Sequence, residues 1–358
     1  MSALKDKYKR YFRNKRVLIT GHTGFKGSWL TAWLKIYGAK IYGLSIGEPT
    51  KPSHYKVSKI FHGVKNIKID IRNRKKLKKI VKKIKPDFIF HLAAQSIVSE
   101  SFKNPLSTWD INSTGSINML ESIRLLRNKC IVVMITSDKC YLNLDRNKAF
   151  KENDSLGGID PYSASKGSAE IIIRSYFNSF FKKSSNIRIA SARAGNVIGG
   201  GDWAKDRLIP DCFKSWKKNK NVLIRSPNAT RPWQHVLDVI HGYILLSVKL
   251  KNKKEISGNS FNLGPGLNSN YTVVQVLREI KKSYNEAKWS IKKNKEYNES
   301  TFLRLNTSKS KNILKWKNYL SFKQTILFTA LWYKNYFEGK KMSGITSLQI
   351  KQIISKIK

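Results

Sequence analysis

Cysteines, acidic residues and long apolar runs are all scarce in this chain. Its 358 residues include three cysteines, an odd number without metal-type spacing, which predicts free thiols in a reducing cytoplasm. No segment approaches the roughly 20 apolar residues that span a bilayer, and no apolar segment follows the basic start at residues 1–16. We therefore expect a soluble, unexported cytoplasmic protein with no membrane partner and no metal site.

The shortage of acidic residues gives the chain a formal net charge of +46, with 69 Lys and Arg against 23 Asp and Glu. Such a charge can drive nucleic-acid binding, but the lysines are spread along the chain and no aromatic-interleaved basic motif accompanies them. In residues 77–84 the apolar side chains recur at helical spacing while lysines fill the other face. We expect a solvated basic surface, a modest attraction for anionic nucleotides, and no nucleic-acid partner.

Hydrophobic residues make up 41% of the chain, enough for a sizeable core and for one large or two modest domains. The alternation of short apolar strands with helices predicts an α/β fold with a doubly wound parallel Rossmann sheet. We assign residues 15–194 to this dinucleotide-binding domain and 195–337 mainly to a smaller C-terminal substrate-binding lobe. Residues 338–358 form a tail of unknown role, either a short helix or disordered. The strands are expected at 17–20, 40–46, 67–69, 88–91, 131–136 and 187–193.

A glycine turn connects the first strand to a helix expected at 28–37. Gly21 can make the tight turn, Gly24 lets the backbone approach a pyrophosphate, and Gly27 allows close packing of helix on sheet. Three glycines alone are a moderately weak signal, but the flanking strand and helix favour a dinucleotide site over ordinary turns. The residues expected at the cofactor are Gly21, Thr23, Gly24, Phe25, Lys26 and Gly27.

Two further residues follow the third strand and could hold an adenine, namely Asp70 and Ile71, although a surface Asp at a strand end is nearly as common. The acidic residue expected on the adenosine ribose, about 20 residues after the glycine turn, is not obvious at 45–48. The choice between NAD and NADP is therefore open from the motif.

A Tyr-x-x-x-Lys pair and an adjoining acid and amine carry the chemistry. Tyr162 and Lys166 fall on one helical face, where the ammonium can lower the phenol pKa. Asp160-Pro161 offers an N-cap and a first-turn proline for that helix. Asp138 and Lys139, just after the fifth strand, add an acid and a potential base that ketone formation alone would not need. The pattern indicates redox chemistry combined with elimination.

Several segments together resemble the extended short-chain dehydrogenase/reductases that act on nucleotide sugars, over residues 15–332. The glycine turn, residues 91–95 and the Tyr-Lys pair carry the broad resemblance. Within that group the strings 136–141, 193–203, 206–211 and 231–236 resemble the CDP-glucose 4,6-dehydratases. The resemblance implies bound NAD, a nucleotide-sugar-binding lobe and a role in deoxysugar biosynthesis, as for the O-antigen of lipopolysaccharide. It adds Leu92, Ala93, Ala94 and Gln95, with Tyr162 and Lys166, to the cofactor contacts.

The implied reaction oxidises C4 of CDP-glucose, eliminates water across C5 and C6, and returns the hydride to C6. The proton of the C4 hydroxyl passes to Tyr162, whose pKa must fall from about 10 toward neutrality. Lys139 is the expected C5 base and Asp138 the acid at C6, while Ser137 hydrogen-bonds the C4 oxygen. An ordinary strand-end serine is the weaker alternative for Ser137.

Lys139 departs from the dTDP-glucose branch, where a Glu follows the Asp and serves as the base. An amine of reference pKa about 10.4 must be neutral to accept a proton, which burial, Lys166 and a cationic cofactor could favour. The alternative is that Lys139 only pairs with Asp138 or a phosphate. Asp138 has a matching requirement, because an acid must be protonated before it donates.

Substrate contacts follow from the same resemblance. Asn196 is expected at the diphosphate, Arg207 and Arg231 at phosphates or ribose, and His235 in the pocket wall. Asn112 either positions a water, supports the active-site backbone, or lies on a helix surface. The alternative activities are another nucleotide-sugar epimerase or a dTDP-, UDP- or GDP-sugar dehydratase.

Two long helices, expected at 105–127 and 161–182, are where relatives commonly pair. They suggest a homodimer or homotetramer, although their apolar faces could equally belong to the core.

Overall fold

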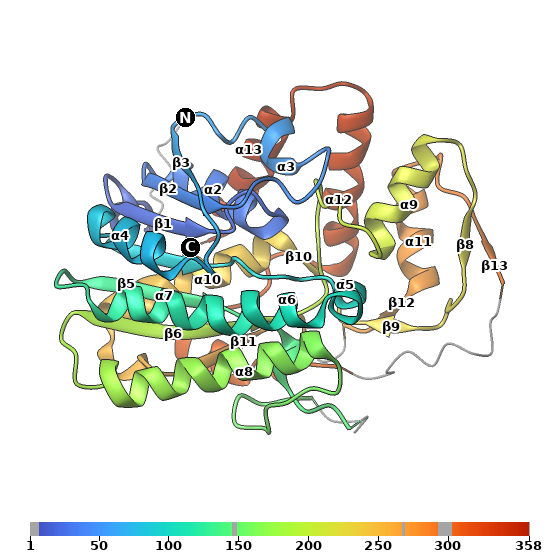
Figure 1. The fold of residues 1–358 in the computed structure, drawn as a ribbon. Coiled ribbons are helices and arrows are strands. Elements are labelled where there is room, and N and C mark those ends of the chain that lie inside the picture. Colours follow the sequence, from blue (N-terminus) through green and yellow to red (C-terminus); the bar gives the residue numbers. More distant parts are fainter. Residues whose placement is uncertain (1–6, 145–148, 267–268, 293–302, 358) are drawn as a thin grey trace.

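A seven-stranded parallel sheet forms the centre of the protein, shown in Figure 1 for the computed structural model, which describes residues 7–144, 149–266, 269–292 and 303–357. The strand order is β11-β6-β5-β4-β1-β2-β3, and every pairing is parallel. The strands are β1 (Arg16–Thr20), β2 (Lys40–Ser45), β3 (Val64–Lys68), β4 (Phe88–His91), β5 (Cys130–Ile135), β6 (Ile187–Ala194) and β11 (Ser260–Leu263).

Helices cover both faces of this sheet, which explains why strands such as β4 are buried along their whole length. One apolar core joins one face to α2 (Phe25–Ile36) and α10 (Val236–Asn252). A second core joins the other face to α4 (Arg74–Ile84), α7 (Gly115–Arg124) and α8 (Pro161–Tyr176). The predicted doubly wound Rossmann fold is confirmed.

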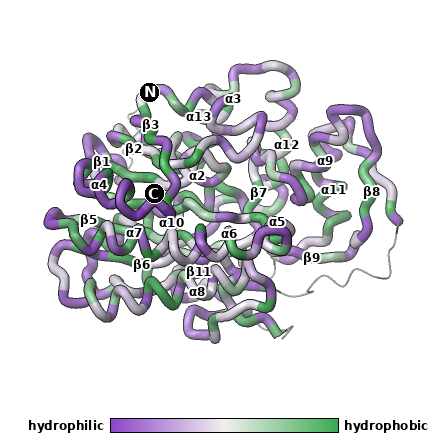
Figure 2. The backbone as a smooth tube through the Cα atoms, in the orientation of Figure 1, coloured by the Kyte–Doolittle hydropathy of each residue, from purple (hydrophilic) through white to green (hydrophobic). Residues whose placement is uncertain are grey.

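The amphipathic pattern at 77–84 is confirmed in α4. Leu77, Val81 and Ile84 are buried, whereas the lysines of the helix are exposed, and Figure 2 colours much of α4 as hydrophilic. Among the described residues, no helix has both the length and the apolar character required to cross a bilayer.

The two long helices are also present, each with a π turn inside. The first runs through α6 (Pro105–Trp109), a π turn at Asp110–Thr114 and α7, and the second through α8 and a π turn at Phe177–Phe181. As predicted, Asp160 caps α8, because its carboxylate accepts from the Ser163 backbone N–H at 2.9 Å. This cap fixes the start of the helix that carries Tyr162 and Lys166.

Residues 195–337 divide between the sheet and the lobe on the right of Figure 1. Strand β11 and helix α10 belong to the Rossmann unit, where β11 covers the edge of β6 that would otherwise expose unpaired backbone. The lobe contains three strand pairs, β7 (Val197–Ile198) with β10 (Gln234–His235), β9 (Thr230–Arg231) with β12 (Tyr271–Thr272), and β8 (Val222–Ile224) with β13 (Trp289–Ile291). Its helices are α9 (Leu208–Lys217), α11 (Val273–Lys281) and α12 (Phe322–Phe337).

The C-terminal segment is the helix α13 (Met342–Ile354), the first of the two alternatives expected for it. Ile350 and Ile353 are fully buried in the core that also contains α2 and α12. The remaining helices are α1 (Lys9–Phe12), α3 (His54–Val57), α5 (Val98–Lys103), two 3-10 turns at Asp138–Cys140 and Lys254–Ile256, and a π turn at Ser310–Leu314.

Candidate active site

A cavity of about 1320 Å³ opens where β1, β4 and β5 end and extends to the lobe. After β1 the chain adds β2 and β3 on one side of the sheet, and then β4, β5 and β6 on the other side, so the strand order changes direction between β1 and β4. Parallel α/β sheets bind ligands at such a point. Pockets for one small ligand usually measure about 300–1,000 Å³. The cavity is therefore large enough for a dinucleotide and a second ligand.

The glycine turn lies at the sheet end of this cavity. Gly21 has a φ of +70°, and a Cβ there would lie 2.8 Å from the Ala93 nitrogen. A Cβ on Gly27 would meet the Gly21 oxygen at 2.1 Å, so only glycine allows α2 to start this close to β1. Gly24 is the N-cap of α2, which places the N-terminus of that helix at the cavity. This arrangement can hold a pyrophosphate.

The other predicted cofactor residues line the same cavity with one exception. Phe25, Lys26, Thr23, Asp70, Ile71, Leu92, Ala93 and Ala94 are all part of its wall. Burial lowers the pKa of Lys26 to about 8. Asp70 forms an ion pair with Arg72 at 2.7 Å, so its carboxylate already has a cationic partner.

The Ser137, Asp138 and Lys139 side chains follow β5 and line the middle of the cavity. The Ser137 hydroxyl donates to Asp138 Oδ1 at 2.9 Å and accepts from the Lys139 backbone N–H at 3.2 Å. Tyr162 and Lys166 reach the cavity from α8, with Lys166 Nζ 5.8 Å from the centre of the Tyr162 ring. The structure thus brings all five predicted catalytic residues together.

The expected fall of the Tyr162 pKa is not produced by the protein groups. Burial raises the pKa of Tyr162 to about 12, and a side-chain hydrogen bond with Ser137 opposes that rise. The pKa of Lys166 is lowered to about 8, chiefly by burial and then by the charge of Lys26. The expectation from the Tyr-x-x-x-Lys spacing was incomplete, because burial of the phenol raises its pKa by more than the Ser137 hydrogen bond and the charge of Arg207 lower it.

Asp138 is also held from the side of the lobe. A Cβ on Gly195 would lie 1.7 Å from Asp138 Oδ2, closer than any side chain could tolerate. Gly195 directly follows β6, so this glycine lets the strand end approach the carboxylate. The sequence contained Gly195 within a family string, but no pattern indicated that its missing side chain makes room for the acid.

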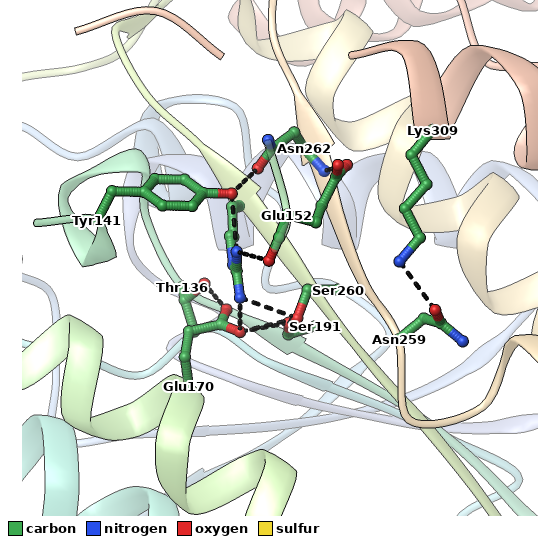
Figure 3. Close-up of polar contacts among 10 residues, drawn as sticks. Thr136, Tyr141, Glu152, Glu170, Ser191, Asn259, Ser260, Asn262 and Lys309 are labelled. Carbon is green, nitrogen blue, oxygen red and sulfur yellow. Dashed lines mark hydrogen bonds and ion pairs between the residues drawn. The ribbon is translucent and has the colours of Figure 1, made fainter. Parts of the chain in front are cut away.

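A buried ionic network beneath the site was missed from the sequence (Figure 3). Glu170 Oε2 accepts from Arg193 Nη2 at 2.7 Å, and Glu170 Oε1 accepts from the Thr136 hydroxyl at 2.5 Å. Arg193 Nη1 also donates to the Tyr141 hydroxyl at 2.7 Å. The available signal was an arginine inside the otherwise uncharged end of a buried strand, since such a charge requires a partner.

The predicted substrate residues divide into two groups. Asn196, Arg207 and Arg231 line the lobe side of the cavity, and Arg207 is paired with Asp202 at 2.8 Å. His235 does not line the cavity, which corrects its expected place in the pocket wall. It is fully buried, and its Nδ1 accepts from the Leu237 backbone N–H at 3.2 Å, so it caps α10.

Gln95 is the exception among the predicted cofactor residues, because it does not line the cavity. Its side chain donates to the Ile97 oxygen and to the Thr108 hydroxyl, both at 2.9 Å. Asn112 is buried, accepts from the Gln95 backbone N–H and donates to the Ser165 hydroxyl, both at 2.9 Å. Of the alternatives for Asn112, support of the active-site backbone matches these contacts.

The cysteines and the acidic residues form no further reactive centre in the described part of the chain. Cys130, Cys140 and Cys212 are free, buried thiols. Burial raises the pKa of Cys140 well above its ordinary value, so this thiol beside the catalytic segment is packed and protonated. Among the described residues, no group of three His, Cys, Asp or Glu side chains is placed to hold a metal ion.

The sheet topology, the glycine turn and the Tyr-Lys helix define a short-chain dehydrogenase/reductase with an added substrate lobe. The family model described as GDP-mannose 4,6 dehydratase matches residues 18–328. The chain belongs to this family of extended short-chain dehydrogenase/reductases.

Comparison with individual proteins gives the same class. The chain is 37% identical to the CDP-glucose 4,6-dehydratase of Salmonella typhimurium, over 97% of this chain and 98% of that protein. Its fold is similar to that of an epimerase from Methanothermobacter thermautotrophicus, with 24% identity, a TM-score of 0.79, and coverage of 94% and 97% of the two chains. It is also similar to the dTDP-glucose 4,6-dehydratase of Bacillus anthracis solved in complex with NAD, with 23% identity, a TM-score of 0.73, and coverage of 91% and 99%.

Proposed function

We propose that this protein is a CDP-glucose 4,6-dehydratase, a hydro-lyase that converts CDP-glucose to CDP-4-keto-6-deoxyglucose and water. The observation that carries the proposal is one cavity whose wall contains Tyr162 and Lys166 together with Ser137, Asp138 and Lys139. The first two residues suit oxidation of a hydroxyl, and the acid and amine suit loss of water. The near full-length similarity to a CDP-glucose 4,6-dehydratase supports this choice of substrate.

NAD is the proposed cofactor, and the cavity residues fit it. The glycine turn and the N-terminus of α2 would hold the pyrophosphate of NAD, and Asp70 and Ile71 would contact its adenine. Residues 92–94 would contact the part of NAD that lies deeper in the cavity. The chemistry that bound NAD would supply is reversible hydride transfer, from C4 of the sugar and back to C6. Because NAD is regenerated in each turnover, we expect it to stay on the enzyme.

The proton transfers are assigned to the residues of this chain. Tyr162 accepts the proton of the C4 hydroxyl, and the resulting ketone acidifies the proton on C5. Lys139 removes that C5 proton, and Asp138 protonates the C6 hydroxyl as it leaves as water. Lys139 later returns its proton to C5. Asn196, Arg207 and Arg231 bind the nucleotide diphosphate and ribose, for which their position at the lobe side of the cavity is suited.

The test is incubation of the purified protein with CDP-, dTDP-, UDP- and GDP-glucose and with GDP-mannose, followed by mass spectrometry. We expect loss of one water, fastest from CDP-glucose. Loss of water from another nucleotide sugar only would replace the substrate, and epimerisation without loss of water would replace the reaction class. Lys139→Met tests the base. We expect it to oxidise C4 but to lose exchange of the C5 proton with D₂O, and full elimination by this variant would contradict the assignment.

We further propose a homodimer or homotetramer that pairs through the two long helices at 105–127 and 161–182, located in the cytoplasm and serving deoxysugar biosynthesis, such as that of O-antigen. Large apolar side chains on these helices support the pairing, because they lie exposed to solvent in the single chain. Leu106 is 75% exposed, and Ile171 and Phe180 are each 48% exposed. Exposed apolar patches of this kind commonly mark protein–protein contacts.

A further inference from the structure

The adenosine end of the proposed NAD site, on which this inference rests, lies where β1, β2 and β3 end side by side. The Thr23 hydroxyl donates to the Gly47 oxygen at 2.6 Å, and the Ile69 backbone N–H donates to the Ser45 oxygen at 2.9 Å. The turn after β2 is therefore joined to the glycine turn on one side and to the end of β3 on the other. In dinucleotide-binding sheets this turn faces the adenosine ribose.

An acidic residue in the turn after β2 selects NAD, because its carboxylate binds the ribose 2′-hydroxyl and repels a 2′-phosphate. Glu48 is the acid that the sequence offers there. Its Oε2 accepts from the Ser53 hydroxyl at 2.6 Å, its Oε1 lies 3.7 Å from Lys56 Nζ, and it is not part of the cavity wall. Glu48 is thus bound at the start of α3 and is not available to the ribose.

Asp70 is the one carboxylate in the cavity wall among the described residues that follow β2 and β3. It accepts from Arg72 Nε at 3.1 and 3.0 Å and from Arg72 Nη2 at 2.7 Å. Because this ion pair compensates the charge of Asp70, the described wall at the adenosine end presents no carboxylate that would repel a phosphate.

Cations and open space are present at the same place. Lys51 lines the cavity, is exposed, and has no hydrogen bond or ion pair among the described residues. Arg72 also lines the cavity, and its bonds to Asp70 leave Nη1 able to donate. A Cβ built on Gly47 would meet nothing within 4 Å, so the turn has room beside it. Lysine and arginine side chains bind phosphates through charge-assisted hydrogen bonds.

We propose that the dinucleotide site accepts NADP as well as NAD, with the 2′-phosphate of NADP held by Lys51 and Arg72 beside Gly47. The open space at this turn also admits the unmodified ribose of NAD. The two dinucleotides differ only in this phosphate, which lies at the adenosine end, and their nicotinamide groups are identical. Either one can therefore supply the hydride transfer of the proposed reaction.

The first experiment is equilibrium dialysis of the purified full-length protein with labelled NAD, against which unlabelled NAD or NADP competes. We expect dissociation constants within about tenfold of each other, whereas a site that repels the 2′-phosphate would differ by about 100-fold or more. Adenosine 2′,5′-bisphosphate and AMP differ only in that phosphate, and the bisphosphate should compete at least as well. Displacement of NAD by NADP only at concentrations more than about 100-fold higher would overturn the inference.

The second experiment repeats the dialysis with variants of the turn. Lys51→Met should raise the dissociation constant of NADP about tenfold and hardly change that of NAD, because only NADP has the phosphate. Ile46 lines the cavity and is 65% exposed, so Ile46→Asp adds a carboxylate without loss of core packing. This variant should weaken NADP about 100-fold and retain NAD.

Lys40→Met is the matched control, because it removes an exposed lysine at the opposite end of β2. It should leave both dissociation constants unchanged. Equal shifts for NAD and NADP in Lys51→Met and in Ile46→Asp would mean that the 2′-phosphate lies elsewhere, and would overturn the inference.

The inference and the proposed function fail in different ways. If the protein binds NAD and dehydrates CDP-glucose but excludes NADP, only the inference is wrong. If it binds both dinucleotides as expected but removes water from none of the nucleotide sugars, the inference holds and the proposed reaction is wrong. Binding of neither dinucleotide would overturn the proposed cofactor and the inference together.

Discussion

Asp138 is fixed from two directions by small residues. Ser137 binds Oδ1 through its hydroxyl, and Gly195 permits the close approach of Oδ2. The acid itself stood out in the sequence beside Lys139, but its supports come from separate strand ends. Because a proton donor must be placed within a few tenths of an ångström, the supports matter as much as the carboxylate.

Replacement of Gly195 should therefore impair elimination more than binding. In Gly195→Ala the new Cβ would lie 1.7 Å from Asp138 Oδ2, so the carboxylate must move away from Ser137. We expect kcat to fall at least about tenfold with a smaller change in KM. Gly344→Ala is the control, because a Cβ at Gly344 meets nothing within 4 Å. Wild-type kcat in Gly195→Ala would show that Asp138 tolerates displacement.

Three elements meet in the buried network around Glu170 and Arg193. Glu170 comes from α8, Arg193 from β6, and Thr136 from the end of β5, next to Ser137. The network therefore ties the helix with Tyr162 to the strand end with the acid (Figure 3). Burial is the largest single influence on the pKa of Glu170 and would raise it, but the charge of Arg193 and the hydrogen bonds from Arg193, Thr136 and Ser191 together outweigh burial, and the net shift is downward.

Removal of this negative charge should destabilise the protein. Glu170→Gln leaves Arg193 buried without its partner, a change that costs about 3–5 kcal/mol of unfolding free energy. Glu121→Gln is the control, because its partners Arg124 and Arg74 are 38% and 65% exposed and each such pair contributes at most about 1 kcal/mol. Urea unfolding at neutral pH measures both. Equal stabilities of the two variants would contradict the role of the network.

The same pair predicts a pH dependence whose sign follows from the lowered Glu170 pKa. A carboxyl whose folded-state pKa is below its ordinary value of 4.5 stabilises the fold at pH values above 4.5. This stabilisation is lost as the pH falls through the folded-state pKa. Wild type should therefore lose stability below about pH 4.5 more steeply than Glu170→Gln, as unfolding at a series of pH values would show.

Helix α13 supports the wall of the cofactor cavity from outside. Thr346 Oγ1 lies 3.1 Å from His54 Nε2 and 2.9 Å from Ser58 Oγ, and His54 Nδ1 lies 2.8 Å from Ser28 Oγ on α2. His54 lines the cavity, so the C-terminal helix is connected to it through one buried imidazole.

Thr346→Val tests this connection, because it removes the hydroxyl but keeps the shape. The buried His54 Nε2 would lose its partner, which should cost about 1–3 kcal/mol and weaken retention of NAD. Thermal unfolding and the dissociation constant of NAD are the measurements. Ser355→Ala, which removes an exposed hydroxyl from the end of the same region, should change neither. Unchanged NAD affinity in Thr346→Val would limit α13 to a packing role.

At the scale of the whole molecule, the exposed apolar faces of α6 and α8 are unusual for a chain with a net charge of +46. The positive charge opposes self-association, so pairing requires a sufficient apolar contact. Such a contact would extend along α8, the helix that carries Tyr162 and Lys166.

Substitution on these faces should give a monomer. Leu106→Glu places a charge at a position that is 75% exposed in the single chain and would be buried in the proposed dimer. We expect sedimentation velocity to show a dimer or tetramer for wild type and a monomer for this variant. Leu223→Glu, on the distant lobe strand β8 and 50% exposed, is the control and should leave the assembly intact. A monomeric wild type would contradict the proposed assembly.

Local patterns in the sequence were sufficient for six of the seven sheet strands, all except β11, and for the glycine turn, the capped helix of Tyr162 and the acid-amine segment after β5. These features depend on residues close together in the chain, where strand and helix periodicity, glycine turns and helix caps act. The family resemblance assigned Gln95 and His235 to the site, and the sequence left three alternatives for Asn112.

Only the tertiary structure decided how distant residues meet. In the structure His235 caps α10, and Asn112 supports Gln95. Residues 236–263 belong to the Rossmann unit, and Glu170 pairs with Arg193. Burial, charge pairing and close approach depend on contacts across the fold, and no short stretch of sequence contains both partners of such a contact.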